Sequence, residues 1–336
     1  KLELPRAGGA PLVAKRSPGG PSFTKVFGDA LLALAERDLR VHALTAGMPS
    51  GTGLTDFAER FPLRFHDVGI CEQHAVAMAA GMAKGGLKPV AAIYSTFLQR
   101  AYDQVFQEVA LQSLPVVFCL DRAGLVGADG PTHNGVFDIA YLRTLPNLVV
   151  CAPRDASDLA RMLEMALRHD SGPVALRWPR DDCPRDEGIP AAERRELGLG
   201  KAEVLREGEE LVIWGFGALV QQALHAADEL AARGIRIGVV DARFAKPLDE
   251  ELLGRDLRAY RHLVTLEEHQ RAGGFGSAVL EVASRLPDTR ARVRMLGVPD
   301  RFVEHMSSRD EQLAELGLDA SGIVKSVVAM LRASLV

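Results

Sequence analysis

The chain has 336 residues, of which 47% are hydrophobic and 25% charged, and its formal net charge is −4 at pH 7. This composition is typical of a globular protein, and the length suits two domains of middling size. No basic block points to nucleic acid as a partner, and no apolar run reaches the ~18 residues of a membrane span. We therefore expect neither nucleic acid nor a membrane as a partner.

The cysteines show no spacing typical of a zinc site or a redox motif, and no signal-peptide pattern follows the first residue. They are Cys71, Cys119, Cys151 and Cys183, and most of them lie in apolar stretches. Free, reduced cysteines are typical of cytosolic proteins. We therefore predict a cytoplasmic location.

Residues 1–21 are rich in Pro and Gly without periodicity, which predicts a linker or extended arm. Ser22 could cap a helix over 23–37, and from there helical and strand-like spacings alternate. We expect strands at 41–46, 64–70, 88–94, 115–121, 147–153 and 172–179, helices at 53–60, from Glu72 onward, 97–112 and 155–169, and a loop at 122–135. Apolar strands separated by helices indicate a mostly parallel sheet covered on both faces.

Residues 181–200 are charged and rich in turn residues, which is typical of an interdomain linker. A second unit follows over 201–336. We expect its strands at 210–215, 235–241, 262–268 and 293–299 and its helices near 218–233, 274–285, 309–315 and 320–334. The predicted fold class is therefore α/β, with two consecutive three-layer domains of mostly parallel sheet, the first of which spans 22–180.

Ligands of open parallel sheets bind beyond the carboxyl ends of the strands, so polar residues that directly follow a strand are candidates. Four segments of the first unit qualify, namely 71–74, 95–100, 121–135 and 177–180. Glu72 is the most unusual residue among them, because the helix that follows is apolar nearly all round over 75–83. An acidic first turn also favours the helix dipole by about 0.3–1 kcal/mol, so the residues alone leave its role open.

Thr96 can cap the predicted helix 97–112, which would place Phe97 and Arg100 on one face. An aromatic ring beside a guanidinium suits a flat heterocycle next to an anion, although a core Phe and a solvated Arg are an equal alternative. Three further arginines, Arg122, Arg177 and Arg180, follow predicted strands. Three arginines on one edge indicate a phosphorylated or carboxylated ligand.

The loop 122–135 has four glycines, and loops of such length are usually functional. It contains Asp129 and His133, and the histidine could exchange a proton with a substrate oxygen or simply be satisfied by a neighbouring turn. A second cluster at 267–276, with Glu267, Glu268 and His269, lacks metal-ligand spacing. We interpret it as a domain-contact loop.

The stretches DVGICEQHAVAMAAGMAKGGLKPVAAIYSTFLQRAYDQV and LPVVFCLDRAGLVGADGPTHNGVFD resemble the 1-deoxy-D-xylulose-5-phosphate synthase family, thiamine diphosphate enzymes of the transketolase superfamily. The resemblance continues through GPVALRWPR and LGLDASGI and covers nearly the whole chain after the first twenty residues. It implies a diphosphate-binding, a pyrimidine-binding and a C-terminal domain, of which this sequence resembles the last two.

The resemblance implies that Glu72 hydrogen-bonds a ring nitrogen of the aminopyrimidine and so promotes loss of the thiazolium proton, and that Phe97 stacks on that ring. Arg100, Arg122 and Arg180 match arginines that bind the acceptor phosphate; Tyr94, Asp129 and His133 match residues around the acceptor and the reacting carbon. The implied reaction joins pyruvate to glyceraldehyde 3-phosphate with loss of carbon dioxide. Its product feeds isoprenoid, thiamine and pyridoxal biosynthesis, and the family likeness also suggests a homodimer.

The GDG motif that holds Mg²⁺ and the diphosphate in such enzymes is absent from this sequence. We therefore expect the cofactors to be thiamine diphosphate and Mg²⁺, with the metal held by an N-terminal diphosphate-binding domain and not by these residues. Because the sequence starts at Lys1, we expect it to be the C-terminal part of a longer enzyme.

Three alternatives stay open. A 2-oxo-acid dehydrogenase decarboxylase beta subunit has the same two domains, but the arginines at 95–105 and 121–133 suit a sugar-phosphate acceptor better. A transketolase would use the same cofactor with ketose phosphates as donors. A non-enzymatic binding or regulatory module is disfavoured by Glu72, which has little purpose without thiamine.

Overall fold

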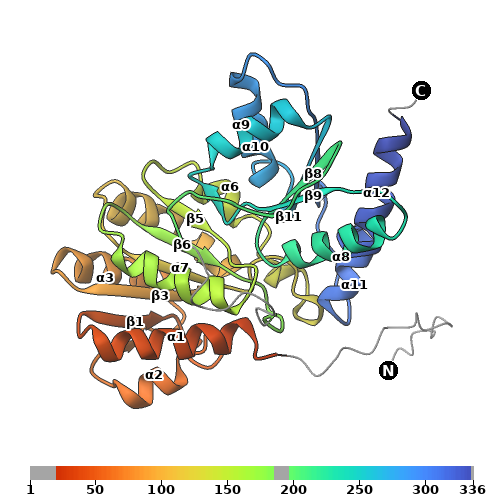
Figure 1. Cartoon of the computed structure of the whole chain (residues 1–336). Helices are drawn as coiled ribbons and strands as arrows, with labels where there is room; N and C mark the ends of the chain where they lie inside the picture. The colour runs from red at the N-terminus through yellow and green to blue at the C-terminus, as the bar shows by residue number, and fades with distance from the viewer. Residues whose placement is uncertain (1–19, 185–196, 334–336) are drawn as a thin grey trace, which may run out of the picture.

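The computed structural model describes residues 20–184 and 197–333 (Figure 1). Most of the predicted arm 1–21, most of the predicted linker 181–200 and the last three residues lie outside the described residues. Over the two described ranges, no helix is both long and apolar enough to cross a membrane.

The first unit is built on a seven-stranded sheet with the spatial order β10-β5-β6-β4-β3-β1-β2. All neighbours are parallel except β10 and β5, which are antiparallel. The strands are β1 (Val41–Thr45), β2 (Phe65–Asp67), β3 (Lys88–Tyr94), β4 (Val117–Asp121), β5 (Val149–Cys151), β6 (Val174–Arg177) and β10 (Phe244–Lys246). Side chains alternate between two cores, as Val90 and Ala92 on one face and Ala91 and Ile93 on the other illustrate.

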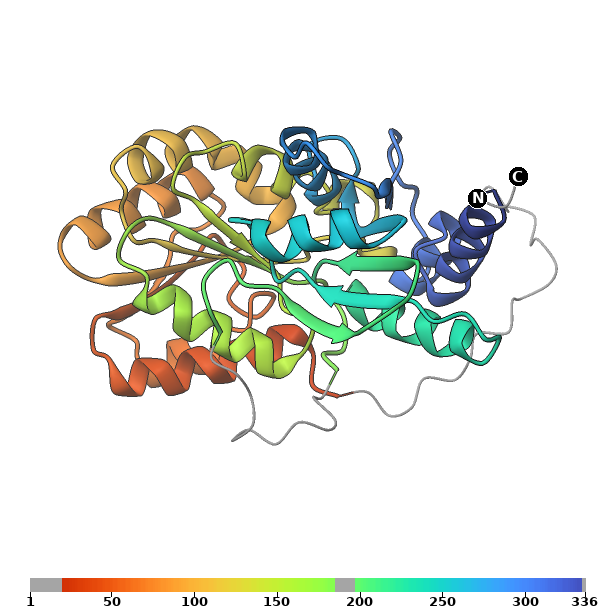
Figure 2. The same cartoon turned by 45° about the horizontal axis from the view of Figure 1, so that its top comes forward.

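Two helix layers cover this sheet (Figure 2). One contains α1 (Phe23–Arg37), α2 (Thr55–Arg60) and α7 (Ala156–Arg168), and the other contains α3 (Glu72–Lys84), α4 (Ser95–Leu98) and α6 (Asp138–Leu142). The side chain of Ser22 caps α1 by accepting the Lys25 N–H, as predicted.

The second unit has a five-stranded sheet with the order β12-β11-β8-β9-β7, parallel except between β7 and β9. Its strands are β7 (Glu203–Arg206), β8 (Leu211–Gly215), β9 (Gly238–Asp241), β11 (His262–Gln270) and β12 (Arg292–Val298). Its helices are α8 (Leu219–Ala231), α9 (Glu250–Ala259), α10 (Phe275–Arg285), α11 (Arg309–Leu316) and α12 (Ala320–Ala333). The helices α8 and α12 pack on one face and α9 and α10 on the other, so the predicted α/β class is confirmed.

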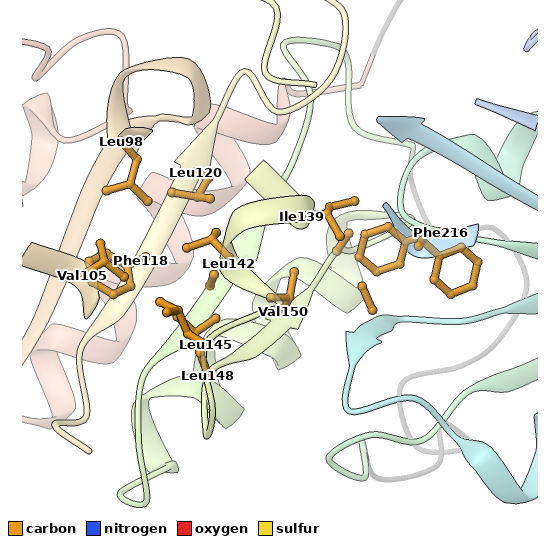
Figure 3. Close-up of a cluster of buried hydrophobic side chains, with 14 of the residues drawn as sticks. Leu98, Val105, Phe118, Leu120, Ile139, Leu142, Leu145, Leu148, Val150 and Phe216 are labelled. Atoms are coloured by element: carbon orange, nitrogen blue, oxygen red, sulfur yellow. The ribbon is translucent and has the colours of Figure 1, made fainter. Parts of the chain in front are cut away.

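The two units share one hydrophobic core. Strand β10 follows the second unit's β9 in the chain but extends the first unit's sheet, where Phe244 pairs with Cys151. Figure 3 shows buried side chains running without interruption from Leu98 and Phe118 in the first unit to Phe216 in the second. The periodicity of the sequence indicates two separate units and does not reveal this junction, because β10 has only three residues.

Two predictions around residues 94–112 are wrong. The predicted helix 97–112 is four short pieces, α4, η1 (Gln99–Ala101), α5 (Tyr102–Gln104) and η2 (Val105–Ala110), of which η1 is a 3₁₀ turn and η2 a π turn. Thr96 is not the helix cap, because Tyr94 passes directly from β3 into that position. The Thr96 hydroxyl instead donates to the carbonyl oxygen of Thr132 at 3.0 Å.

Other elements also differ from the predictions. Strand β11 extends to Gln270, so Glu267–His269 lie on a strand rather than in a loop. The short elements α6, β7 and β10 and the charge-rich α9 were not predicted. Helix α3 is not buried all round, because its His74, Ala77 and Gly81 are exposed. Its exposed positions carry small or polar side chains, which hydrophobic content alone does not distinguish.

Candidate active site

Glu72 is the first residue of α3, and its side chain is only 1% exposed. A buried carboxylate needs a partner, and Nη1 of Arg100 donates to its Oε2 at 2.5 Å. Arg100 comes from the 3₁₀ turn η1, and its side chain is half exposed. The pair therefore links a buried acid to the solvent-accessible edge of the sheet.

An aromatic wall lies beside this pair. Tyr94 ends β3 and stacks on Phe97 of α4, with ring centroids 5.5 Å apart and planes 17° apart. The ring of His133 meets Phe97 edge-on at 5.3 Å. A pocket of about 360 Å³ opens here, lined by Thr96, Phe97, Gln99, Arg100 and Thr132. Its lining offers an aromatic ring, a guanidinium and hydroxyl groups, which suits a flat heterocycle with polar edges.

A second pocket, of about 310 Å³, contains two of the predicted arginines. Its lining residues are Ser22, Thr24, Ser50, Gly51, Arg122, Arg180, Asp181 and Asp182. Guanidinium forks and hydroxyl donors together suit an anion with several oxygens, such as a phosphate. The first pocket, by contrast, has Arg100 as its only arginine among its lining residues.

Arg122 is held rigidly in an unusual backbone conformation. Its φ is +58°, in the left-handed region that non-glycine residues seldom occupy. Its Nη1 donates to Gly51 O at 2.9 Å and to Asp121 at 3.2 Å, and its guanidinium lies 3.8 Å from the centre of the Tyr94 ring. Strain of this kind collects at functional sites, where surrounding contacts maintain it.

Asp129 and Tyr94 connect the predicted residues into one set. Asp129 lies 3.5 Å from Nε of Arg122 and pairs with Arg180. Tyr94 touches Arg122 on one side and Phe97 on the other, so it separates the two pockets. Burial raises the pKa of Tyr94, so its phenol stays protonated at neutral pH.

One predicted edge arginine does not belong to this set. Arg177 is 4% exposed, and its Nε donates to Asp138 at 2.8 Å, between the sheet and the second unit. Of the three arginines predicted at this edge, Arg122 and Arg180 therefore line the second pocket, and Arg177 is buried.

Some site residues were not anticipated. Ser50 and Gly51 lie in the loop after β1 but do not follow that strand directly, so the rule of polar residues after a strand does not find them. Gly51 must lack a side chain, since a Cβ there would overlap the Tyr94 hydroxyl. Asp121 accepts hydrogen bonds from Thr24 Oγ1 and Trp178 Nε1, and it also accepts one from Arg122, which helps to position that side chain. Burial raises the pKa of Asp121.

The part of the chain that the structure describes contains no group of three or more His, Cys, Asp or Glu side chains able to hold a metal ion. All four cysteines are free; Cys71 is exposed and the other three are buried. The two pockets offer aromatic, cationic and hydroxyl groups, and the second also has the carboxylates of Asp181 and Asp182 in its lining.

Known proteins resemble both units. Residues 20–185 match the family model of the transketolase pyrimidine-binding domain, and residues 200–323 match that of the transketolase C-terminal domain. The chain is 53% identical over 318 residues to 1-deoxy-D-xylulose-5-phosphate synthase 1 of Geobacter sulfurreducens and 53% identical over 317 residues to 1-deoxy-D-xylulose-5-phosphate synthase of Aquifex aeolicus. Each match covers 94% of this chain and 49% of the relative, so the chain spans about half the length of these relatives.

Among solved structures, a split-gene transketolase described as an inactive beta4 tetramer aligns with a TM-score of 0.81 and 33% identity. That alignment covers 93% of this chain and 98% of the other. The same two domains therefore make up nearly all of a known transketolase chain. The present chain belongs to the transketolase family, of which it contains a pyrimidine-binding and a C-terminal domain.

Proposed function

We propose that this chain forms the pyrimidine-binding half of a thiamine diphosphate site, together with the acceptor site, of a cytoplasmic 1-deoxy-D-xylulose-5-phosphate synthase. The enzyme joins pyruvate to glyceraldehyde 3-phosphate with release of carbon dioxide, a step toward isoprenoids, thiamine and pyridoxal. The observation that carries the proposal is the buried Glu72 beside an aromatic pocket, with a two-arginine pocket one side chain away. The curated relatives named above support it.

The first pocket fits an aminopyrimidine. Phe97 offers a ring for stacking, and Glu72, which is bonded to the pocket residue Arg100, would offer a carboxyl group to a ring nitrogen. When bound, thiamine diphosphate supplies the carbon centre that takes up the acyl unit of pyruvate. Glu72 holds and releases the proton at the pyrimidine nitrogen, and its burial keeps competing water away. Arg100 keeps the carboxylate in place and is also a proposed substrate-binding residue.

The second pocket suits the acceptor's phosphate. Arg122 and Arg180 would each offer a guanidinium fork to the phosphate oxygens. Tyr94 lies between Arg122 and Phe97, and Asp129 contacts both arginines, so both residues would face the rest of the acceptor. His133, on the same side as Phe97, would deliver a proton to the aldehyde oxygen as the new bond forms.

Mg²⁺ and the diphosphate would be held by a separate diphosphate-binding domain. One fact supports this: the matched family models are those of the pyrimidine-binding and C-terminal domains. The solved split-gene transketolase, whose chain has the same extent, is described as inactive, which agrees with a need for a partner domain.

We further propose a homodimer formed through the exposed stripe of α3. The stripe contains Ala77 and Gly81, small residues that allow close approach of a second copy. Ile70 and Leu111 nearby are 83% and 70% exposed, which supports an apolar contact. The tetrameric description of the split-gene transketolase supports self-association of this fold.

A second candidate is a transketolase, which would take ketose phosphates as donors with the same cofactor and the same phosphate pocket. Supplying pyruvate and a ketose phosphate separately to the complete enzyme distinguishes the two. The two-arginine pocket disfavours a 2-oxo-acid dehydrogenase beta subunit, because a lipoyl acceptor carries no phosphate.

Glu72→Gln tests the proposal in the enzyme completed with its diphosphate-binding domain. The amide keeps the shape of the side chain but cannot hold the proton, so turnover should fall by about a hundredfold or more. Proton exchange at the thiazolium carbon, followed by NMR, should slow in parallel. The matched control is Glu267→Gln, a second buried glutamate, which lies on β11 outside the site and accepts the Phe275 and Gly276 N–H groups of the first turn of α10. Unchanged exchange in the Glu72 variant would refute the assignment.

A further inference from the structure

The loop 122–135, which carries Arg122, Asp129 and His133, is held largely by the second unit. We call it the acceptor loop. The N–H of Leu125 donates to Glu268 Oε1 at 2.8 Å, and the N–H of Gly127 donates to Gln312 Oε1 at 2.7 Å. The Asn134 side chain donates to the carbonyl oxygen of Val303 at 3.2 Å. Glu268 lies on β11 and Gln312 on α11.

The backbone of the acceptor loop approaches the second unit too closely for side chains. A Cβ at Gly124 would lie 2.6 Å from the Glu268 carboxyl group, and one at Gly127 would lie 2.5 Å from the Ser308 backbone. Both glycines also have positive φ, at +109° and +60°. The loop is therefore shaped against the second unit and not only against its own sheet.

Arg309 on α11 joins this support to the opposite wall of the phosphate pocket. Its Nε donates to Glu268 Oε1 at 2.7 Å, its Nη2 donates to Glu268 Oε2, and its Nη1 donates to Asp181 Oδ2 at 2.6 Å. Asp181 follows Arg180 directly and lines the pocket. The buried Arg309 guanidinium therefore connects Glu268, which binds the acceptor loop, to Asp181, the residue after Arg180.

We propose that Arg309 and Gln312 are positioning residues that set the spacing of Arg122 and Arg180 for the acceptor phosphate. Neither lines the pocket, so each acts through the acceptor loop or Asp181. Bidentate binding of phosphate depends on the distance and angle between the two guanidinium groups, and small misplacements weaken it. This inference rests on the proposed function, and it gives the C-terminal domain a specific task in acceptor recognition.

The guanidinium fork is needed for this arrangement. A lysine at position 309 keeps the charge but has all its N–H donors on one nitrogen, so it cannot reproduce the bonds that Nε, Nη1 and Nη2 direct to Glu268 and Asp181. A methionine at position 312 keeps the volume of Gln312 but removes the oxygen that accepts the Gly127 N–H. Arg309→Lys and Gln312→Met therefore alter the positioning with the smallest change in packing.

Arg143 provides a matched control. Like Arg309 it connects the two units, because its Nε donates to Gly273 O at 2.7 Å and its Nη1 donates to Glu281 at 2.9 Å. It has no contact with the acceptor loop among these bonds. Arg143→Lys therefore weakens the junction without altering the spacing of the pocket arginines.

The experiment uses the complete enzyme and compares glyceraldehyde 3-phosphate with unphosphorylated glyceraldehyde. Arg309→Lys and Gln312→Met should lower the ratio of the two kcat/KM values about tenfold, mainly through the KM of the phosphorylated acceptor, and leave pyruvate decarboxylation unchanged. Hydrogen exchange, read by mass spectrometry in the absence of substrates, should quicken in residues 123–135. Arg143→Lys should change neither the ratio of the two kcat/KM values nor the hydrogen exchange in residues 123–135.

Equal losses with both acceptors, or unchanged exchange in the loop with a lower melting temperature, would overturn the inference and leave Arg309 as an ordinary contact between the units. Failure of the proposed function has a different signature, in which the unmodified enzyme makes no product from either aldehyde. In that case the exchange measurement still tests whether Arg309 holds the acceptor loop, because it compares Arg309→Lys with Arg143→Lys without any substrate.

Discussion

Arg100 and Arg122 carry the same charge, but they have different contacts, so we expect them to have different roles. Arg122 is mostly buried, and its guanidinium contacts Gly51, Asp121 and the Tyr94 ring beside the second pocket. Arg100 is half exposed and partners the buried Glu72 beside the first. Loss of either side chain should therefore affect acceptor use. Loss of Arg122 leaves buried Asp121 with its hydrogen bonds from Thr24 and Trp178. Loss of Arg100 removes the cation that pairs with Glu72, the proposed partner of the cofactor.

For Arg122→Ala we expect kcat/KM with glyceraldehyde 3-phosphate to fall about ten- to a hundredfold, since hydrogen bonds to charged groups contribute roughly 1.5–3 kcal/mol. Pyruvate decarboxylation should change much less. Arg100→Ala should lower both, and steady-state assays of each half-reaction measure the difference. Equal loss of both half-reactions in Arg122→Ala would mean that this arginine supports the fold or contacts the donor.

His269 is a buried residue whose ionisation affects stability. Its Nδ1–H donates to Gln270 O at 2.6 Å, and its Nε2 accepts the Ala140 N–H at 3.3 Å, so both ring nitrogens are used in the neutral form. Burial lowers the pKa of His269 from 6.5 to about 4. The charged groups that face its ring are Asp138, which opposes this shift, Arg177 and Glu267.

Because the folded-state pKa is lower than the unfolded one, unfolding takes up a proton at acidic pH. The contribution of neutral His269 is fully present above pH 6.5 and is lost as the pH falls toward 4, with a slope of up to about 1.4 kcal/mol per pH unit. His269→Gln should remove this part of the slope. Urea unfolding at several pH values between 4 and 7 measures it, and identical slopes in both proteins would contradict the assignment.

At the scale of elements, the short strand β10 joins the two units, because it pairs with β5 at the edge of the first sheet. Phe244 lies fully buried in the core between the first sheet, α1 and α7, although its chain neighbours belong to the second unit. Removing its ring leaves a cavity that the two packed units cannot close. Phe244→Ala should therefore destabilise the chain by about 3–5 kcal/mol.

Calorimetry measures this effect, and Phe302→Ala is its control because Phe302 is 79% exposed. The control should change stability by no more than about 0.5 kcal/mol. A similar melting temperature for Phe244→Ala and the unmodified chain would show that β10 is a peripheral contact and not an integral strand of the first sheet.

Elements with strong periodicity could be predicted from the sequence, and irregular ones could not. Helix α1 with its Ser22 cap follows from local spacing alone. The division of residues 95–110 into α, 3₁₀ and π turns does not follow from the sequence. Over only a few residues, the spacing of apolar side chains is too similar in these three kinds of helix to distinguish them. That division carries Arg100 to Glu72, so the pairing depends on tertiary packing. Arg177 ends β6 and Arg122 directly follows β4, so their sequence positions are similar. Arg177 is nevertheless buried, because it bonds to Asp138 and to the carbonyl oxygens of Gly135 and Glu268.

At the scale of the whole molecule, the shared core and the acceptor loop make the two units one folding and binding body. One face of each sheet contributes to a single buried cluster, and the second unit supplies the bonds that shape the loop. Unfolding one unit alone would expose the apolar side chains that the other unit covers, so we expect the two units to unfold together. The chain should therefore keep both pockets formed when it is expressed by itself.

The isolated chain should nevertheless be inactive. Glu72 and Phe97 contact only the pyrimidine end of thiamine diphosphate in the proposed site, and Mg²⁺ and the diphosphate contribute the strongest electrostatic contacts elsewhere. Expressed as Lys1–Val336, the chain should melt in one transition, self-associate by light scattering and yield no product from pyruvate and glyceraldehyde 3-phosphate. Adding the diphosphate-binding domain of a close relative should restore measurable turnover. Full activity of the isolated chain would show instead that its own residues hold the diphosphate, and the division of the site between domains would have to be abandoned.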